Sequence, residues 1–452
     1  DIGLSPPANN FHDLQGQTCS TFPLIVDFCS NCKCIQLRDC LDKEFLYKHY
    51  TYITPDIEPL TQHYKKLIDH LMSSFYITSQ AKCLEIGSNK GLFLKTIKPY
   101  VSSILGVDPA INVVEIANDL GIETICSFFD QSVAKEIKVN KGKVDLVVAR
   151  HMFAHNSDPK IILEGVREIL SSEGIFLIEN AYAIPTFNKA EFDQIYHEHM
   201  FYYSVQSIKF LLEKFSFELI DLFDSNVHGG SLVFIAANKK KKKISNRVKE
   251  YLNHEESLLD RGDMFNKFKK KIKDLKEKVI LEINKDMERG KLVGAYGATA
   301  KSFTMFTYFG LNKEKIKYCV DTTPTKINKY YPFFEIPVVS EDYFISHPVD
   351  TLLVTAWNYK EHIIKKSENL FPQGTKLIFP LPELMVKYHP FISRTEPPVD
   401  CTRIRILSRR EAPNDEIPEV ALGVQLKEST LANSVVMSVQ PSSVSTSGLE
   451  PA

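Results

Sequence analysis

The sequence has no long apolar run, almost no excess of charge and few cysteines for its length. No stretch approaches the roughly 18 apolar residues of a membrane-spanning helix, which excludes such a helix. Its 55 basic and 56 acidic residues give a formal net charge of −1, so no overall field favours nucleic acid or an anionic membrane. Nine cysteines do not make a disulfide scaffold and fit a reducing environment. We therefore expect a cytoplasmic protein with no nucleic-acid or membrane partner.

The start of the chain also lacks two features. Residues Asp1-Ile2-Gly3 have neither the charged nor the apolar segment of a secretory leader, so we expect no signal peptide. They also lack an initiator methionine, and we therefore expect further residues upstream. No feature of the sequence indicates an oligomeric state.

Length and composition divide the chain into four parts. A chain of 452 residues is too long for one ordinary core and predicts about two to three domains. Residues 1–58 are rich in cysteine and turns, whereas strands alternate with helical patterns over 59–243, which is typical of a doubly wound sheet. Residues 244–394 begin with a charged amphipathic helix and continue as a second α/β unit. Residues 395–452 lack periodicity, and we predict a disordered tail.

Hydrophobic periodicity gives the expected elements of the two α/β units. In the first unit we expect helices near 60–72 and 207–215, and strands at 82–86, 104–107, 144–149, 175–179 and 232–236. In the second we expect helix over 244–289, and strands at 292–296, 318–320, 351–355 and 376–379. The predicted fold class is α/β, with two Rossmann-like units and a small cysteine-containing N-terminal part.

A strand, a tight turn and the start of a helix follow one another at residues 83–94. Gly87 lets the chain turn without a Cβ clash, and Gly91 lets the helix approach the sheet closely. Glu85 ends the strand, where its carboxylate can orient loop amides or the cationic end of a ligand. Asp108 ends the next strand, 23 residues later, close to the spacing of an acid that binds ribose hydroxyls. The pattern predicts a cofactor site; the alternative is a structural turn.

Two features favour S-adenosylmethionine over a dinucleotide as the cofactor. Asn89 stands where a dinucleotide fingerprint has its middle glycine, so a pyrophosphate could not approach the turn as closely. The strand over 144–149 is followed by polar and bulky residues, beginning with Arg150, where the methionine end of S-adenosylmethionine would lie. We therefore predict a methyltransferase and include Asn89 and Arg150 in its cofactor site.

The second α/β unit carries a comparable turn. Residues 294–301 follow a strand and open a helix, so their amides could receive a diphosphate, with Lys301 adding positive charge. Asp321 and Asn358 follow further strands, at the edge where such sheets bind ligands. One turn would hold the methyl donor and the other a nucleotide-linked acceptor. The glycines of His228-Gly229-Gly230 also permit close approach of a substrate, although a hairpin turn explains them equally well.

With these motifs in order, the sequence resembles the S-adenosylmethionine-dependent sugar C-methyltransferases of deoxysugar biosynthesis. The resemblance runs from Gly3 to Leu384. Besides the cofactor turn, its markers are Pro23-Leu24, Cys29-Ser30-Asn31-Cys32, Tyr50-Thr51-Tyr52, Tyr196-His197-Glu198-His199, His228-Gly229-Gly230-Ser231, Gly297-Ala298-Thr299-Ala300-Lys301 and Ala356-Trp357-Asn358. It implies a zinc-binding N-terminal domain, a methyltransferase middle domain and a C-terminal Rossmann-like domain that holds a nucleotide-sugar. The implied reaction methylates a carbon next to a keto group of that sugar.

The resemblance assigns the chemistry to Tyr196-His197-Glu198-His199. C-methylation needs a base that removes a proton beside a carbonyl, and donors that stabilise the enolate oxygen. On the family pattern His199 is the base and Tyr196 a neighbouring donor, while Glu198 could orient an imidazole or bind substrate. Tyr50 resembles a substrate-side tyrosine. Without the family, the cluster could hold a metal on one strand face or be a satisfied structural cluster, and Tyr50 could serve packing.

The N-terminal part departs from the family in its cysteines. The family has four zinc ligands in two pairs, and only Cys29 and Cys32 stand in place. Two thiolates cannot close a tetrahedral site, so we expect a structural zinc whose first cysteine pair lies upstream of Asp1. The alternative is that the cysteines are ordinary reduced thiols. Four residues could substitute for the missing pair without its spacing: Cys19, Cys34, Cys40 and His12.

Two other functions stay open at this point. The chain could transfer the methyl group to an oxygen or nitrogen of another small molecule, which needs no enolate-forming base. It could also be a nonenzymatic nucleotide-sugar-binding homologue, which would bind S-adenosylmethionine without turnover.

Overall fold

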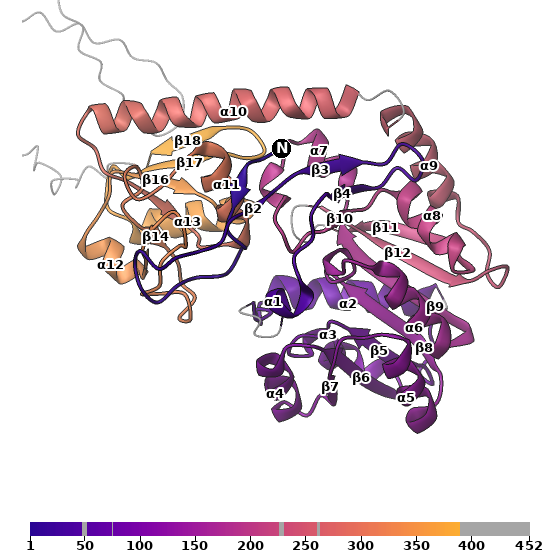
Figure 1. Cartoon of the computed structure of the whole chain (residues 1–452). Helices are drawn as coiled ribbons and strands as arrows, with labels where there is room; N and C mark the ends of the chain where they lie inside the picture. Colours follow the sequence, from indigo (N-terminus) through magenta and orange to yellow (C-terminus); the bar gives the residue numbers. More distant parts are fainter. Residues whose placement is uncertain (48–51, 75, 226–229, 260–262, 389–452) are drawn as a thin grey trace, which may run out of the picture. The chain divides into compact units, whose positions relative to one another are not determined.

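The structure is a computed structural model that describes residues 1–47, 52–74, 76–225, 230–259 and 263–388. Tyr50, His228 and Gly229 lie outside these residues, as does the predicted tail at 395–452. The described residues form sheets of two, three, seven and six strands (Figure 1). None of the helices in these residues is long and apolar enough to cross a membrane.

The seven-stranded sheet has the doubly wound arrangement that the sequence predicts. Its strands stand in the order β11-β12-β9-β8-β5-β6-β7. Neighbours from β9 to β7 pair in parallel, whereas β12 runs antiparallel to both β9 and β11. The bounds are β5 (Lys82–Ile86), β6 (Ser103–Asp108), β7 (Thr124–Cys126), β8 (Val144–Arg150), β9 (Leu170–Ala181), β11 (Phe217–Ser225) and β12 (Ser231–Asn238). The predicted Rossmann-like class is confirmed.

Helices cover both faces of this sheet because successive apolar side chains of its strands point to opposite sides. Leu146 and Val148 of β8 pack with α2 (Glu58–Ser73), α3 (Leu92–Ile97) and α4 (Ile111–Asp119) on one face. Val147 and Ala149 belong to the cluster that includes α5 (Gln131–Lys141), α6 (Pro159–Ile169) and α8 (Val205–Lys214) on the other. We call this sheet and its helices the first lobe (residues 58–238).

The six-stranded sheet and its helices form the second lobe (residues 293–388). Its strand order is β15-β14-β13-β16-β17-β18, and β18 alone pairs antiparallel. The strands are β13 (Val293–Tyr296), β14 (Cys319–Val320), β15 (Val338–Val339), β16 (Thr351–Val354), β17 (Lys376–Phe379) and β18 (Met385–Tyr388), and the helices are α11 (Ala300–Phe309), α12 (Glu341–Ser346) and α13 (Lys360–Leu370). This second parallel sheet matches the predicted second Rossmann-like unit.

Two helices connect the lobes where the sequence predicts one helix over 244–289. They are α9 (Asn246–Leu259) and the long α10 (Asp263–Glu288), labelled in Figure 1. Buried Glu255 of α9 accepts hydrogen bonds from the backbone N–H groups of Val205 and Gln206, at the start of α8. On α10, Asp286 pairs with buried Lys376 of β17 at 2.8 Å. Each connecting helix is thus fixed to one lobe by a buried carboxylate.

The N-terminal residues contribute strands to two small sheets, one of which also contains a strand of the first lobe. The two-stranded sheet joins β1 (Leu4–Ser5) to β2 (Phe22–Pro23), and in the other sheet β3 (Val26–Phe28) pairs with β4 (Ile35–Leu37). Beside β4 lies β10 (Phe201–Tyr202), which follows the first lobe's predicted catalytic cluster. The short α1 (Lys43–Tyr47) follows β4. The N-terminal residues therefore support the segment that carries Tyr196 and His199.

Several elements differ from the sequence prediction. The strand predicted at 175–179 is the longer β9, and β7, β11, β15 and β18 were not predicted. In β11 the buried Asp221 interrupts the apolar pattern, and it is neutralised by Arg247, whose Nη2 lies 2.5 Å from its Oδ2. The short strands β7 and β15 have too few residues to show a period. By contrast, β5 and β17 have the predicted bounds.

Candidate active site

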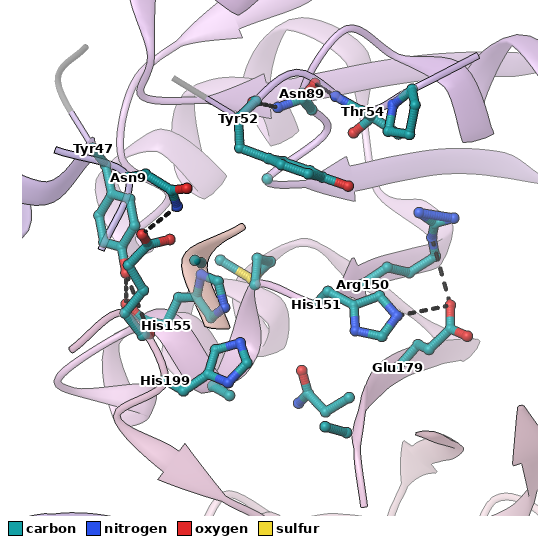
Figure 2. A pocket seen from close by; sticks show the side chains of 18 of the residues that line it. Asn9, Tyr47, Tyr52, Thr54, Asn89, Arg150, His151, His155, Glu179 and His199 are labelled. Atoms are coloured by element: carbon teal, nitrogen blue, oxygen red, sulfur yellow. Dashed lines mark hydrogen bonds and ion pairs between the residues drawn. The ribbon is translucent and has the colours of Figure 1, made fainter. Parts of the chain in front are cut away.

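One cavity of about 620 Å³ is lined by the carboxyl ends of strands from both lobes. In Figure 2, Tyr47 and Asn9 lie on its left and Arg150 and Glu179 on its right, with histidine rings between them. With the exception of Gly91, its lining includes every described residue that the sequence assigns to catalysis, cofactor or substrate. These residues are Glu85, Gly87, Asn89, Asp108, Arg150, Tyr196, Glu198, His199, Lys301, Asp321 and Asn358.

The predicted cofactor turn depends on residues with positive φ. Gly87 and Gly91 have φ of +69° and +76°, and added Cβ atoms would lie 2.8 Å from Met152 and 2.6 Å from Ile122. Glycine is therefore needed at both positions for space as well as for conformation. Asn89 between them has φ of 49°, a left-handed conformation that asparagine tolerates better than most residues.

The side chains of Asn89 and Asp108 fix the loops around this turn. Asp108 Oδ2 accepts a hydrogen bond from Asn89 N at 2.8 Å, and Oδ1 accepts one from Ala110 N at 3.0 Å. The Asn89 amide donates to Tyr52 O at 3.0 Å and accepts from Thr54 N at 2.9 Å. Asn89 thus holds the segment before α2 against the cavity. Each oxygen of Asp108 keeps a second lone pair that can accept a further hydrogen bond.

A group of buried charges lies at the ends of β5, β8 and β9. Arg150 Nε is 3.5 Å from Glu85 Oε1, and Arg150 Nη2 donates to Tyr64 Oη at 2.8 Å. Burial raises the pKa of Glu85 to about 8, although Arg150 opposes the shift. Burial alone would also raise the pKa of Glu179, but the hydrogen bond with His63, whose Nε2 lies 2.7 Å away, and the neighbouring His151 and Arg150 lower it below its usual range. The two carboxyls therefore differ in charge near neutral pH.

Tyr196 and His199 form a hydrogen-bonded pair. Tyr196 Oη lies 2.6 Å from His199 Nε2, and His199 Nδ1 lies 2.8 Å from the carbonyl oxygen of Gln194. A carbonyl can only accept, so Nδ1 carries the proton and Nε2 accepts from the tyrosine. Burial holds the pKa of His199 well below its usual value, and the nearby His155 adds to this shift. His199 is therefore a neutral imidazole whose basic nitrogen faces a hydroxyl.

The other two members of the cluster have different surroundings. Residues 196–199 form a turn in which His199 N donates to Tyr196 O at 2.9 Å, so the alternative of a shared strand face is wrong. Glu198 Oε1 accepts from the Asn9 amide at 2.9 Å. The His197 ring lies 6.0 Å from that of Phe22, and burial lowers its pKa to about 4. His197 is thus a packed, neutral side chain.

At the second-lobe wall, Asp321 repeats the arrangement of Asp108. Its oxygens accept from Ala298 N at 2.6 Å and from Thr323 N at 2.7 Å. Lys326 Nζ donates to Ala298 O at 2.8 Å, and burial lowers its pKa. In both lobes an acid at the end of a strand thus binds one amide of the preceding glycine turn and one amide of its own loop.

The predicted metal ligands Cys29 and Cys32 lie in the turn between β3 and β4. Hydrogen bonds from the backbone of Cys32 and Asn31 lower the pKa of Cys29, whereas burial raises that of Cys32. Within the described ranges, no group of three or more His, Cys, Asp or Glu side chains could hold a metal. These residues supply two thiol donors and do not fit a closed tetrahedral zinc site.

Among the cavity residues that were not selected from the sequence are His155, Phe128 and Asn9. The His155 ring lies 5.0 Å from that of His199, and His155 follows the polar end of β8. Phe128 follows the unpredicted β7, and Lys43 Nζ lies 4.6 Å from its ring. Asn9 is far away in sequence, so only tertiary contact brings it to Glu198. A systematic inspection of the residues after each predicted strand could have found His155.

Comparison with known proteins supports the middle and C-terminal parts separately. A methyltransferase domain family matches residues 60–222, and a family described as the C-methyltransferase C-terminal domain matches 226–382. The C-methyltransferase NovU of Streptomyces niveus is 33% identical over 388 residues, which are 84% of this chain and 92% of NovU. The uncharacterized methyltransferase YcgJ of Bacillus subtilis (strain 168) is 28% identical over 109 residues, 23% of this chain and 42% of that protein.

The crystal structure of YcgJ from the same species aligns with a TM-score of 0.31 and 14% identity, and the alignment covers 40% of this chain and 99% of YcgJ. The match to NovU extends over nearly its whole length and includes both matched domains. A methyltransferase sheet and a C-methyltransferase C-terminal domain thus occur in one chain. The chain belongs to the S-adenosylmethionine-dependent C-methyltransferases.

Proposed function

We propose that this C-methyltransferase methylates a carbon next to a keto group of a nucleotide-linked deoxysugar, through an enolate. The observation that carries the proposal is the 2.6 Å contact between Tyr196 and His199 in a cavity that both lobes line. Carbon becomes a nucleophile only after it loses a proton, so C-methylation needs a base at the acceptor. A neutral, buried imidazole with a bound hydroxyl meets this need.

In this mechanism the pair acts as one base, and Nε2 of His199 is the final site of the proton. The Gln194 carbonyl keeps Nδ1 protonated and so leaves Nε2 as the basic atom. Burial raises the pKa of Tyr196 well above its usual value, so its phenolate is unfavourable without the imidazole. Glu198, held by Asn9, is proposed to orient the acceptor on the other side of the turn. Tyr50 remains a substrate-side candidate outside the described residues.

The first lobe fits the methyl donor. Around the turn, Glu85 Oε2, Ser88 Oγ and Arg150 Nη1 are buried and have no hydrogen-bond partner within the described residues. Such atoms can form hydrogen bonds with a ligand that carries charged and polar groups. When bound, S-adenosylmethionine supplies an electrophilic methyl group on a sulfonium. We propose that Asp108 binds the ribose, Gly87 and Gly91 admit the ligand, and Glu85 with Arg150 binds the methionine end.

The second lobe is proposed to bind the nucleotide part of the acceptor. Lys326, Asp321 and Asn358 line the same cavity, in the segments that follow β14 and β16. This placement would direct the sugar toward Tyr196 and His199 and the nucleotide away from the methyl donor. His228 and Gly229 lie outside the described residues, in the segment between β11 and β12. Their substrate role stays a proposal from the sequence.

The test uses solvent deuterium and a panel of nucleoside-diphosphate-linked keto-deoxyhexoses. With S-adenosylhomocysteine bound, the wild-type protein should exchange the proton beside the keto group of an accepted sugar, since proton removal needs no transferable methyl. His199→Ala should lower both exchange and methylation by roughly 10²–10⁴-fold, the usual contribution of a positioned base. Tyr196→Phe should lose less, because the imidazole remains.

Two controls make the result specific. The affinity of His199→Ala for S-adenosylhomocysteine should stay near the wild-type value in calorimetry. His197→Ala, which changes the packed histidine of the same turn, should retain its exchange rate once its fold is verified by circular dichroism. Normal exchange in His199→Ala would exclude this histidine as the base. A wild-type protein that methylates no member of the panel would contradict the proposed acceptor class.

A further inference from the structure

The ammonium of Lys301, on the first turn of α11, is buried in the cavity wall. Nζ has no hydrogen-bond partner among the described residues. It lies 4.9 Å from the centroid of the Trp357 ring, whose face attracts a cation. An ammonium taken out of water without a hydrogen bond is costly, so folded proteins rarely contain one without a functional reason. The ring of Trp357 orients this ammonium, and the N–H groups of the ammonium can donate hydrogen bonds to a ligand.

The contacts of α11 place Lys301 on the side of the cavity that carries the base. Trp357 Nε1 donates to the buried Asp193 Oδ2 at 2.6 Å. From the same helix as Lys301, Thr304 Oγ1 donates to Ile195 O at 2.5 Å. These two bonds attach the second lobe to residues 193–195. Tyr196 is the next residue of that segment.

The charge of Lys301 also acts on His199. The carbonyl of Gln194, in the segment that α11 contacts, fixes His199 Nδ1 at 2.8 Å. Burial has the largest effect on the pKa of His199, which it lowers, followed by His155 and the hydrogen bond to Gln194. The charge of Lys301 lowers this pKa further. Lys301 also opposes the effect of burial on the pKa of Asp193. Its charge therefore acts at the base.

Two of the amides near Lys301 are engaged within the protein, which favours a role for Lys301 other than that of the diphosphate ligand expected from the sequence. Ala298 N donates to Asp321 at 2.6 Å, and Ser302 N donates to Thr299 Oγ1 at 3.3 Å. A diphosphate would need amides of this turn together with the lysine. At Lys301 an anion would find one ammonium and an aromatic face, which suits a single oxygen better than a phosphate.

We propose that the Lys301 ammonium binds the keto oxygen of the acceptor and stabilises the negative charge that forms on it in the enolate. The inference rests on the proposed function. When the base takes the proton, the electrons of the C–H bond form a carbon–carbon double bond and the carbonyl π electrons move to the oxygen. The carbonyl then re-forms as the carbon bonds to the methyl group, and the methyl–sulfur bond breaks to leave a neutral thioether. Lys301 keeps its proton throughout and is a catalytic residue.

Lys301→Met is the main test, because methionine keeps an unbranched stem against Trp357 and removes the charge. With S-adenosylhomocysteine and saturating acceptor, we expect deuterium exchange to fall by roughly 10²–10³-fold, as for loss of one oxyanion donor. Affinity for thymidine diphosphate and uridine diphosphate, measured by calorimetry without the sugar, should change little. Lys301→Arg, which keeps a cation, should recover part of the exchange.

The control is Lys313→Met, a lysine of the same lobe whose side chain is 49% exposed and pairs with Glu335 on the surface. It should exchange at the wild-type rate. If Lys301→Met weakens nucleoside diphosphate binding about tenfold or more while exchange at saturation is normal, Lys301 is a phosphate ligand and the inference is wrong. Normal values for both would also overturn it.

Folding and the acceptor class are tested separately. If Lys301→Met melts at a much lower temperature or fails to bind S-adenosylhomocysteine, Lys301→Gln replaces it in the same assays, with the same expected loss of exchange. A wild-type protein that exchanges no keto-sugar of the panel would overturn the proposed function and this inference together. A wild-type protein that exchanges, beside a Lys301→Met protein that exchanges equally well, would overturn the inference alone.

Discussion

Replacing Gly91 by alanine tests the packing that shapes the cofactor turn. Its φ of +76° costs an L-residue roughly 1–2 kcal/mol. An added Cβ would also lie 2.6 Å from Cγ2 of Ile122, and overpacking of a core costs about 1–3 kcal/mol. Ile122 is 2% exposed and has no room to move into solvent. Together these costs predict a loss of about 2–5 kcal/mol in the free energy of unfolding.

Gly121→Ala is the matched control in the same lobe. Gly121 has φ of +73°, but a Cβ added there would meet nothing within 4 Å, so the change should cost the conformational part alone. Urea titration followed by circular dichroism compares the two variants. Combining Gly91→Ala with Ile122→Ala should cost less than the sum of the single changes, because the colliding methyl groups are gone. Equal losses for both glycines, or strict additivity, would refute the role of Ile122.

Three further predictions concern ligands and pH. Asp108→Ala should weaken S-adenosylmethionine binding by roughly 1–3 kcal/mol in calorimetry, and an unchanged affinity would remove Asp108 from the ribose site. Because the folded-state pKa of Glu85 is about 8, above its usual value, the stability that its neutral form provides is lost as pH rises toward 8. Without ligand, Glu85→Gln should therefore gain stability over the wild type by a few kcal/mol between pH 5 and 8 in urea titrations, and a constant difference would contradict the shift. Elemental analysis of this chain should find less than one zinc per molecule, since Cys29 and Cys32 supply two of four ligands; a full equivalent would mean that other residues complete the site.

Local signals made the two parallel sheets and the cofactor turn predictable. The run at β5 (Lys82–Ile86) is mostly apolar and is followed by Gly87, so both its bounds and its role as the strand before the turn can be read directly. Asp108 could be placed because an acid at the end of the next strand lies beside that turn in any doubly wound sheet. Tyr196 and His199 were selected because the motif Tyr196-His197-Glu198-His199 resembles that of the family, and the structure brings their side chains together at 2.6 Å.

Properties that depend on tertiary contact could not be read in this way. The sequence assigned Lys301 to a diphosphate because it opens a helix after a glycine turn, whereas the contact of its ammonium with the ring of Trp357 joins residues 56 positions apart. The contact between Asn9 and Glu198 joins residues 189 positions apart. The pairing of β10 with β4 also joins distant segments, and two-residue strands have no period of their own. In each case the partner is chosen by packing across the chain.

The first thirteen residues bear on attempts to exchange acceptor specificity between relatives. Asn9 bonds Glu198 beside the base, while Phe11 packs edge-on against Tyr331 and His12 forms a backbone bridge with Tyr330. A chimera spliced only between α9 and α10 would therefore meet a foreign surface at Phe11, and the disturbance would reach Glu198 through Asn9, two residues earlier on the same segment. Swapping the second lobe requires two junctions, with the leading peptide transplanted together with the lobe it contacts.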